Sequence, residues 1–364
     1  MKKNLYLLLC FALFVVACRK NNDSVTLTVA PKMVAFDSDQ NSTLMFQDTE
    51  SMAVMTSDAR RYNIAHIIRV KPVDNNNIEV ANFAPFDIEN ATILATISGS
   101  TTGSALQVIK LFTISKIRAH AKQTIKYPFV DGTTLFLDTN NKTVDLSQYK
   151  TNGIAAANVS FDFTGDNPTI QKLKKLARLK WDIRYHDYNP DKTPGSNWDP
   201  NFNAKKIRAY TGLMINLGIA LASDDFKQQF LNEPIIGNDG VTALTDAEKL
   251  KTYNDIINFN YLLCGSVDGG SAVGLGGGST YGLAAYLVTG NYTYISYVGF
   301  GDTAAHEFGH CVGYNHSSNM TYPQTINGVS TGFSPVLIRV WQKLYNNGSF
   351  ATTLTNYYKP TDFK

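Results

Sequence analysis

The most informative spacing in the chain lies in residues 304–316, AAHEFGHCVGYNH. Three of the six histidines fall there, in the pattern H-E-x-x-H-x-x-G-x-x-H: His306, His310 and His316. On a helix, side chains four residues apart project from one face, so the first two rings can share one ion. Gly313 lets the chain leave that helix through a positive φ and bring the third ring back. Three neutral nitrogens with a fourth position open are typical of a single catalytic zinc ion.

Glu307 lies one step round the same helix, beside the expected metal, and is the candidate general base. We expect Asp302 or Thr303 to cap this helix at its start. The opposing interpretation is an ordinary helix whose histidines are core residues. Gly313 and His316 in frame argue against it.

The pattern resembles the elongated zinc-binding motif of the metzincin clan of zinc endopeptidases, which includes matrix metalloproteinases, astacins, serralysins and reprolysins. The resemblance implies a methionine turn beneath the metal, and Met320 is the residue in place. It also implies that Tyr322 contacts the metal or the oxyanion, with simple packing as the alternative. Only three residues separate His316 from Met320, fewer than most metzincins use. Either this turn is unusually tight or Met320 is not its equivalent.

The resemblance extends weakly to both sides of the motif. Residues 281–286, YGLAAY, resemble the segment before the zinc helix of reprolysins. In the clan an antiparallel edge strand borders the cleft and pairs with extended substrate, and Gly282–Tyr286 or Tyr292–Val298 is the candidate strand here. Pro335–Tyr345 has the spacing of the closing helix.

Length and composition predict a multidomain α+β protein. The chain has 364 residues, 44% of them hydrophobic, enough for two cores. Residues 25–152 are expected to form an immunoglobulin-like β-sandwich, because short apolar runs alternate there with turn residues. These runs are Val25–Val29, Ile64–Val70, Ala91–Ile97, Leu106–Ile114 and Thr133–Leu137. Residues 153–166 are expected as a linker, and residues 167–364 as a metzincin-like catalytic domain.

Helices and strands are expected to interleave in that second domain. Helical spacing covers Pro168–Arg178, Ala204–Ala222 and Thr245–Phe259, the last with a capping pattern. Leu179–Tyr185 alternates as a half-buried strand does. Gly269–Gly282 lacks the fingerprints of a phosphate-binding loop, so we expect a flexible surface loop.

The first residues have the features of a bacterial secretory leader. Lys2 and Lys3 precede an apolar run too short to span a bilayer, and residues 15–18, VVAC, resemble a lipobox. This predicts a signal peptide over residues 1–17, lipidation of Cys18 and a tether over residues 18–24. The alternative is an ordinary cleaved signal with a chance cysteine.

Two cysteines remain beyond the leader, Cys264 and Cys311. One disulfide between them is chemically permitted, but two buried free thiols are favoured. The formal net charge of +3 gives no sign of nucleic-acid binding.

These features predict a secreted, lipid-anchored zinc endopeptidase of the bacterial cell envelope, in which zinc activates a water and Glu307 takes its proton. We expect a monomer that acts on protein or peptide substrates and meets the membrane only through its N-terminal lipid. The alternative is a non-catalytic surface lipoprotein that binds glycan or protein and keeps a structural metal domain.

Overall fold

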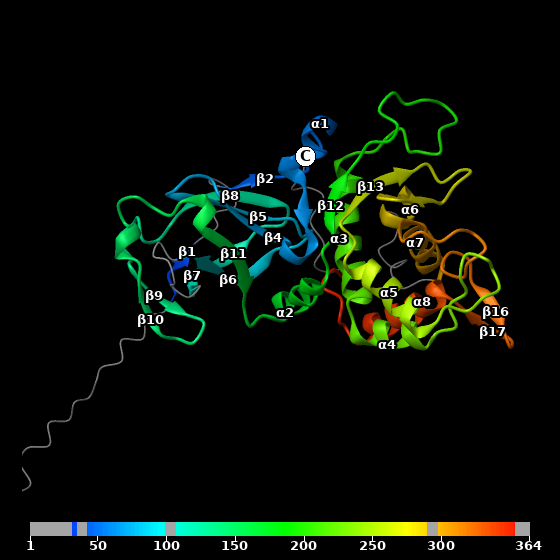
Figure 1. The fold of residues 1–364 in the computed structure, drawn as a ribbon. Helices are drawn as coiled ribbons and strands as arrows, with labels where there is room; N and C mark the ends of the chain where they lie inside the picture. Colours follow the sequence, from blue (N-terminus) through cyan, green and yellow to red (C-terminus); the bar gives the residue numbers. More distant parts are fainter. Residues whose placement is uncertain (1–30, 35–41, 99–106, 290–297, 354–364) are drawn as a thin grey trace, which may run out of the picture. The chain divides into compact units, whose positions relative to one another are not determined.

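The computed structural model describes residues 31–34, 42–98, 107–289 and 298–353. The described residues all belong to one compact unit, which begins at Pro31 (Figure 1). Its described residues have a mixed α+β fold with several antiparallel sheets and eight α-helices. The predicted α+β class is therefore confirmed at this level.

Several predictions of the sequence concern residues outside the described part. These are the signal peptide over residues 1–17, the tether over residues 18–24 with Cys18, the strand Val25–Val29, and all but the last residue of Tyr292–Val298. Within the described part, no helix has both the length and the apolar character needed to cross a membrane.

Two mainly antiparallel sheets are built from the chain before Asp166. The larger has the order β10-β9-β7-β6-β11, with β1 also beside β7, and the smaller has the order β2-β8-β5-β4. The larger sheet contains β1 (Met33–Val34), β6 (Ile88–Ile97), β7 (Gln107–Ile117), β9 (Leu135–Asp138), β10 (Thr143–Asp145) and β11 (Val159–Thr164). The smaller contains β2 (Thr43–Leu44), β4 (Ile68–Pro72), β5 (Asn77–Asn82) and β8 (Ala121–Lys126).

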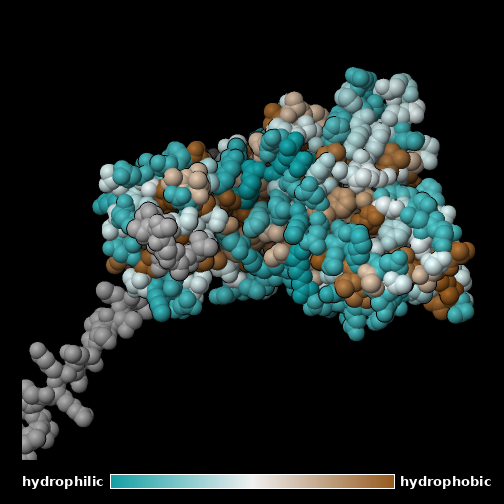
Figure 2. All heavy atoms as spheres, viewed as in Figure 1, coloured by the Kyte–Doolittle hydropathy of each residue, from teal (hydrophilic) through white to brown (hydrophobic). Residues whose placement is uncertain are grey.

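Strand β6 illustrates why these segments are strands. Every second side chain from Ala91 to Ile97 is buried, as a strand with one face on a core requires. Tyr127, just after β8, stacks on Phe161 of β11 at 6.4 Å between ring centroids, so aromatic side chains connect the two sheets. Polar residues cover most of the visible face in Figure 2, with apolar side chains in scattered patches.

The stretch Gly153–Asp166, expected as a linker, is ordered structure. It contains β11, which pairs antiparallel with β6 from Val159 opposite Ile97 to Thr164 opposite Thr92. Its small and polar residues suggested a connection, but the alternating Val159, Phe161 and Phe163 pack against the core. A strand thus occupies part of the expected linker, and the domain boundary there stays a prediction.

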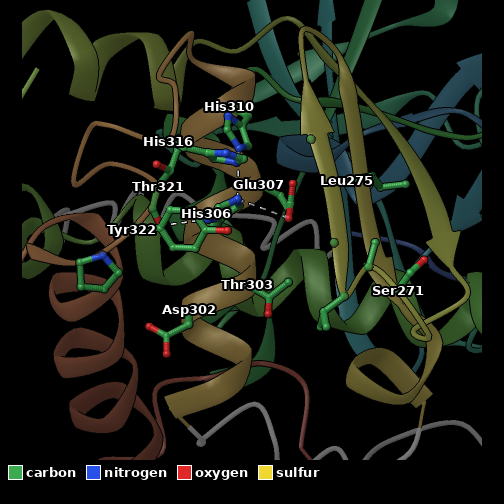
Figure 3. Close-up of a pocket in the computed structure, with 15 residues that line it drawn as sticks. Ser271, Leu275, Asp302, Thr303, His306, Glu307, His310, His316, Thr321 and Tyr322 are labelled. Carbon is green, nitrogen blue, oxygen red and sulfur yellow. Dashed lines mark hydrogen bonds and ion pairs between the residues drawn. The ribbon is translucent and has the colours of Figure 1, made fainter. Parts of the chain in front are cut away.

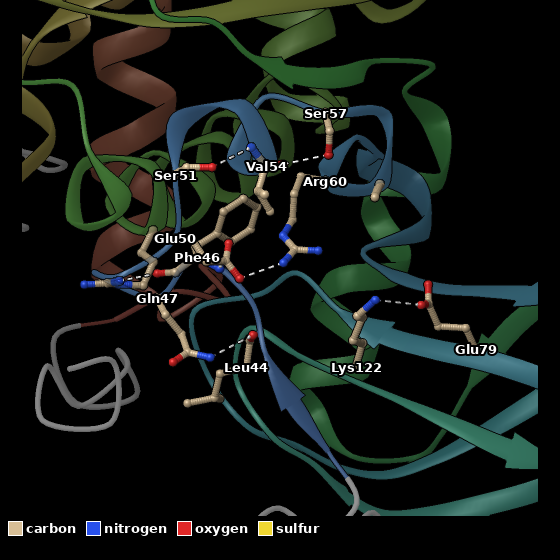
Figure 4. A network of polar contacts seen from close by, with 12 residues as sticks. Leu44, Phe46, Gln47, Glu50, Ser51, Val54, Ser57, Arg60, Glu79 and Lys122 are labelled. Carbon is tan, nitrogen blue, oxygen red and sulfur yellow. Dashed lines mark hydrogen bonds and ion pairs between the residues drawn. The ribbon is translucent and has the colours of Figure 1, made fainter.

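The segment between β2 and β4 links two strands of the smaller sheet. It holds α1 (Met52–Met55), three short pieces, η1 (Asp58–Arg60), β3 (Tyr62–Asn63) and η2 (Ile64–His66), and then β4. Ile64–Val70 was expected as one strand, but the Asn63 side chain accepts a hydrogen bond from the Ala65 amide and starts a 3-10 turn. Glu50 accepts hydrogen bonds from the Phe46 amide at 3.0 Å and from Arg60 at 2.6 Å (Figure 4).

A five-stranded sheet with the order β14-β15-β13-β12-β3 forms the framework of the second half. Its three central strands run parallel, β12 (Asp182–Tyr185), β13 (Tyr261–Val267) and β15 (Thr280–Ala284). The two edge strands, β3 and β14 (Gly274–Gly277), run antiparallel to their neighbours. The alternation expected for Leu179–Tyr185 is confirmed by the burial of Leu179, Trp181, Ile183 and Tyr185.

The expected helices are confirmed, with small shifts of their ends. They are α2 (Pro168–Lys174), continued by η5 (Lys175–Arg178), α3 (Ala204–Leu221), α5 (Asp246–Ile257) and α8 (Phe333–Asn346). Further helices are α4 (Asp224–Asn232), α6 (Ala285–Thr289) and α7 (Val298–Cys311), and short pieces are η3 (Ser147–Tyr149), η4 (Ala156–Asn158), β16 (Gln324–Ile326) and β17 (Val329–Thr331). In α3 every residue except Lys205 and Lys206 is buried, which makes it a core helix. The Thr245 and Glu248 side chains form the predicted capping box of α5.

Candidate metal centre and cleft

Helix α7 presents His306 and His310 on one face, as their four-residue spacing predicts (Figure 3). Their Nε2 atoms lie 3.1 Å apart. The helix extends from Val298 to Cys311, so Asp302 and Thr303 lie inside it. The expectation that one of them caps the helix is therefore wrong, because the helix begins at least four residues earlier.

His316 reaches the same point from the loop after α7. Gly313 has a φ of 93° and its amide donates to the His310 carbonyl at 3.0 Å, which ends the helix and turns the chain back. The ring of His316 lies 5.2 Å from that of His306 and 4.8 Å from that of His310, between centroids. One nitrogen from each ring lies within 4.8 Å of the others.

Backbone carbonyls orient two of the rings. Nδ1 of His306 lies 3.1 Å from the Thr321 carbonyl, and Nδ1 of His310 lies 2.7 Å from the Tyr314 carbonyl. A carbonyl only accepts, so each Nδ1 donates its proton and each Nε2 keeps a lone pair for a metal. Burial, with His310 next in weight, lowers the pKa of His306 to about 4, and burial also lowers the pKa of His310. Neutral, oriented imidazoles are the donor set that zinc requires, so these residues fit the ion.

Glu307 lies beside the triad and is 5% exposed. Its Oε1 is 4.0 Å from Nε2 of His306. Burial raises its pKa to about 7, because the low-dielectric surroundings disfavour the charged carboxylate. A carboxyl group with this pKa can accept and release a proton near neutral pH.

The glycine-rich stretch Gly269–Gly282 is not the flexible surface loop that its composition suggested. It contains the hairpin of β14 and β15, and β14 passes directly over Glu307. A Cβ on Gly274 would lie 2.2 Å from Oε1 of Glu307, and one on Gly276 would lie 2.4 Å from its carbonyl oxygen. The glycines are therefore needed for the close approach of strand and helix.

The same hairpin corrects the expected edge strand. Gly282–Tyr286 was a candidate for it, but β15 is an inner strand that pairs with both β13 and β14. Strand β14 is the edge strand beside the cleft. Glycine has low strand propensity, which is why the sequence pointed elsewhere.

Met320 and Tyr322 lie next to the triad in the loop after His316. Met320 is fully buried, and a Cβ on Gly309 of α7 would lie 2.3 Å from its carbonyl oxygen. The Tyr322 ring lies 4.4 Å from the His306 ring and 5.1 Å from the His316 ring, and it is 53% exposed (Figure 3). Both residues therefore lie in the loop that follows the triad, and their roles as floor of the site and as oxyanion contact stay predictions.

A second segment, which no sequence motif pointed to, forms hydrogen bonds with this loop. The Asn319 side chain accepts from the Ile236 amide at 2.7 Å and donates to the Pro234 carbonyl at 2.9 Å. Asn238 accepts from the Asn315 amide at 2.8 Å and donates to the Gly313 carbonyl at 3.0 Å. No local pattern in the sequence indicated these contacts, whose partners are 75 to 85 residues apart.

The triad opens onto a cleft of about 740 Å³. Three segments line it: residues 271–276 leading into and along β14, one face of α7, and the loop after His316. The lining residues are Ser271, Ala272, Val273, Gly274, Leu275, Gly276, Asp302, Thr303, His306, Glu307, His310, His316, Thr321, Tyr322 and Pro323.

Cys264 and Cys311 are free and buried, which confirms the favoured interpretation over a disulfide. The thiol of Cys311 donates to the Thr280 carbonyl at 3.1 Å. Burial raises the pKa of Cys311 to about 12 and that of Cys264 further. Both thiols are therefore protonated at neutral pH and serve as packing groups.

No family model matches this chain, and comparisons with curated proteins and with solved structures also give no match. Functional inference therefore rests on the residues and geometry of the chain itself.

Proposed function

We propose that this chain is a zinc-dependent endopeptidase of the metzincin type, with His306, His310 and His316 as zinc ligands and Glu307 as general base. The observation that carries the proposal is the convergence of three imidazole nitrogens within 4.8 Å at a cleft that also contains a buried glutamate. A purely structural site has no use for a glutamate with a raised pKa beside its ligands. This favours the enzyme over the non-catalytic surface protein.

Each residue of the cleft has a separate role in the proposed hydrolysis of a peptide bond. A bound zinc ion would supply Lewis acidity, which acidifies water and polarises a peptide carbonyl. Glu307 takes the proton of the attacking water and later gives it to the leaving amine, as its pKa of about 7 allows. The Tyr322 hydroxyl, on a ring beside His306, is suited to donate a hydrogen bond to the oxygen on which negative charge develops.

The proposed setting is the bacterial cell envelope. The lipobox-like residues 15–18 support a lipid anchor on Cys18, with the protein acting as a monomer on protein or peptide substrates. The two sheets before Asp166 favour an immunoglobulin-like sandwich as the first domain. The histidine triad favours a metzincin-like domain over residues 167–364. Aromatic contacts between the sheets, such as Tyr127 on Phe161, are what such a sandwich requires.

Replacing Glu307 with glutamine tests the proposal directly. Glutamine keeps the size of the side chain but cannot take a proton, so turnover of a quenched casein or peptide substrate should fall by about 10²–10⁴-fold. Zinc content, measured by mass spectrometry, should stay at the level of the unmodified protein.

Glu89→Gln is the matched control, because Glu89 is exposed and lies on β6, outside the residues that line the cleft. It should leave activity unchanged, and a chelator should abolish activity in both the control and the unmodified protein. Full activity of zinc-loaded Glu307→Gln would refute the assignment of the base.

A further inference from the structure

Much of the cleft wall is apolar. Val273, Leu275, Tyr322 and Pro323 contribute apolar or aromatic surface, and the described lining residues include no lysine or arginine. Apart from the triad and Glu307, Asp302 is the one charged residue in the part of the lining that the structure describes.

Asp302 lies on helix α7 one turn before His306, so the two residues share a face about 6 Å apart along the axis. Figure 3 shows the carboxylate on the same helix as His306, below the ring of Tyr322 in that view. Asp302 lines the same cleft as the triad and the Tyr322 ring.

The Asp302 carboxylate has a hydrogen-bond donor but no positive charge beside it among the described residues. The hydroxyl of Ser334, which is 1% exposed on α8, donates to Oδ1. Among the described residues Asp302 has no cationic partner within ion-pair distance. A partly buried carboxylate that lacks a cation is stabilised by any positive group that approaches it.

We propose that Asp302 is a specificity-determining residue that selects substrates with a lysine or arginine side chain next to the scissile bond. The inference rests on the proposed peptidase function and adds its substrate class. An ammonium or guanidinium group completes the hydrogen bonds of the carboxylate, whereas an apolar side chain leaves it unpaired and an acidic one is repelled.

Binding of two peptide hydroxamates to the zinc-loaded protein tests this selection without catalysis. The compounds differ only in the side chain next to the hydroxamate, lysine in one and norleucine in the other. Calorimetry should show that the lysine compound binds about tenfold or more tightly. Asp302→Asn keeps the size of the side chain and the acceptor for Ser334, and it should abolish the difference. Asp302→Lys should make a glutamate compound bind more tightly than a glutamine one.

Cleavage sites in denatured casein, mapped by mass spectrometry, provide the second arm. They should carry lysine or arginine on one side of the cut bond, and this preference should disappear in Asp302→Asn. Asp255→Asn is the control, because it removes the same charge from a partly exposed position on α5 outside the cleft. It should change neither readout.

The outcomes separate this inference from the proposed function. Chelator-sensitive cleavage without a basic preference, or a preference that survives in Asp302→Asn, overturns the role of Asp302 and leaves the peptidase. Tighter binding of the lysine compound without any cleavage supports Asp302 as a selector of basic groups and overturns the peptidase.

Discussion

His306 and His310 are partly buried in helix α7, and each Nδ1 faces a backbone carbonyl, whereas His316 is exposed on the following loop. His316→Ala should therefore leave the metal-free fold intact but weaken zinc binding by more than about 100-fold, beyond the 10–100-fold typical of a lost supporting hydrogen bond. Zinc content after dialysis against a zinc buffer, with thermal unfolding of the metal-free protein alongside, measures both effects.

The control is His186→Ala, which removes another exposed histidine that lies outside the triad. It should retain zinc. If His316→Ala retained zinc at the level of this control, the third ligand would have been assigned wrongly.

At this scale the sequence predicted what is local. The spacing of the three histidines and the positive φ at Gly313 depend on neighbours within one helix and one turn, so they could be inferred. The turn of α7 that precedes Asp302 could not be inferred, because no capping residue in the sequence marks the start of the helix at Val298. The contact of Asn319 with Pro234 and Ile236 was also invisible, since no pattern links residues about 80 positions apart.

Strand β14 is the element whose glycines make room for Glu307. In Gly274→Ala the added Cβ meets Oε1 of Glu307 at 2.2 Å, so strand or carboxylate must move, which should destabilise the protein by about 1–3 kcal/mol. In a Glu307→Ala background the same substitution should cost much less. Urea unfolding of the two single variants and the double variant measures this coupling.

Gly270→Ala provides the matched control. A Cβ there would have one neighbour, the Asp268 carboxylate at 3.5 Å, and the backbone φ is not positive. It should change stability little. Equal costs of Gly274→Ala with and without the Glu307 side chain would show that β14 does not pack on that carboxylate as described.

Helices and strands whose apolar residues recur at a regular spacing could be predicted, and those without such a spacing could not. The apolar spacing of Ala204–Ala222 and the capping box at Thr245 gave helices that the structure confirms. Strand β14 (Gly274–Gly277) has no alternation of apolar side chains, since three of its four residues are glycines. Two of them, Gly274 and Gly276, lie so close to Glu307 that a Cβ would clash with it. Composition alone therefore suggested a loop where close packing produces a strand.

At the scale of the whole molecule, the contacts between segments far apart in the sequence could not be predicted from local patterns. Strand β3, within the predicted sandwich, pairs with β12 of the sheet that leads to the site, with Tyr62 opposite Ile183. Arg208 of α3 donates to Asp48 at 2.8 Å. The domain boundaries at residues 153–166 stay a prediction, but these contacts predict that the two parts unfold together.

His120 lies at this junction and should make it sensitive to acid. It is fully buried, its ring meets Phe46 edge-on at 5.7 Å, and the Phe46 ring in turn meets Tyr185 of β12 at 5.8 Å. Burial, and to a lesser extent the charge of Arg208, lower its pKa well below 6.5. Below about pH 6.5, His120 therefore binds a proton in the unfolded chain but stays neutral in the folded chain. Stability from the neutral ring is complete above about pH 6.5 and falls by up to about 1.4 kcal/mol per pH unit below it.

His120→Asn should remove this contribution, because asparagine does not titrate and tolerates the φ of 45° at this position. Free energies of unfolding, measured between pH 7.5 and 5 with chelator present, should therefore fall less steeply in the variant than in the unmodified protein. The chelator keeps the triad metal-free in both, so its histidines contribute equally to the two slopes. His66→Asn, at an exposed histidine of η2, should keep the steep slope. Parallel slopes for His120→Asn and the unmodified protein would mean that the buried ring does not link protonation to unfolding.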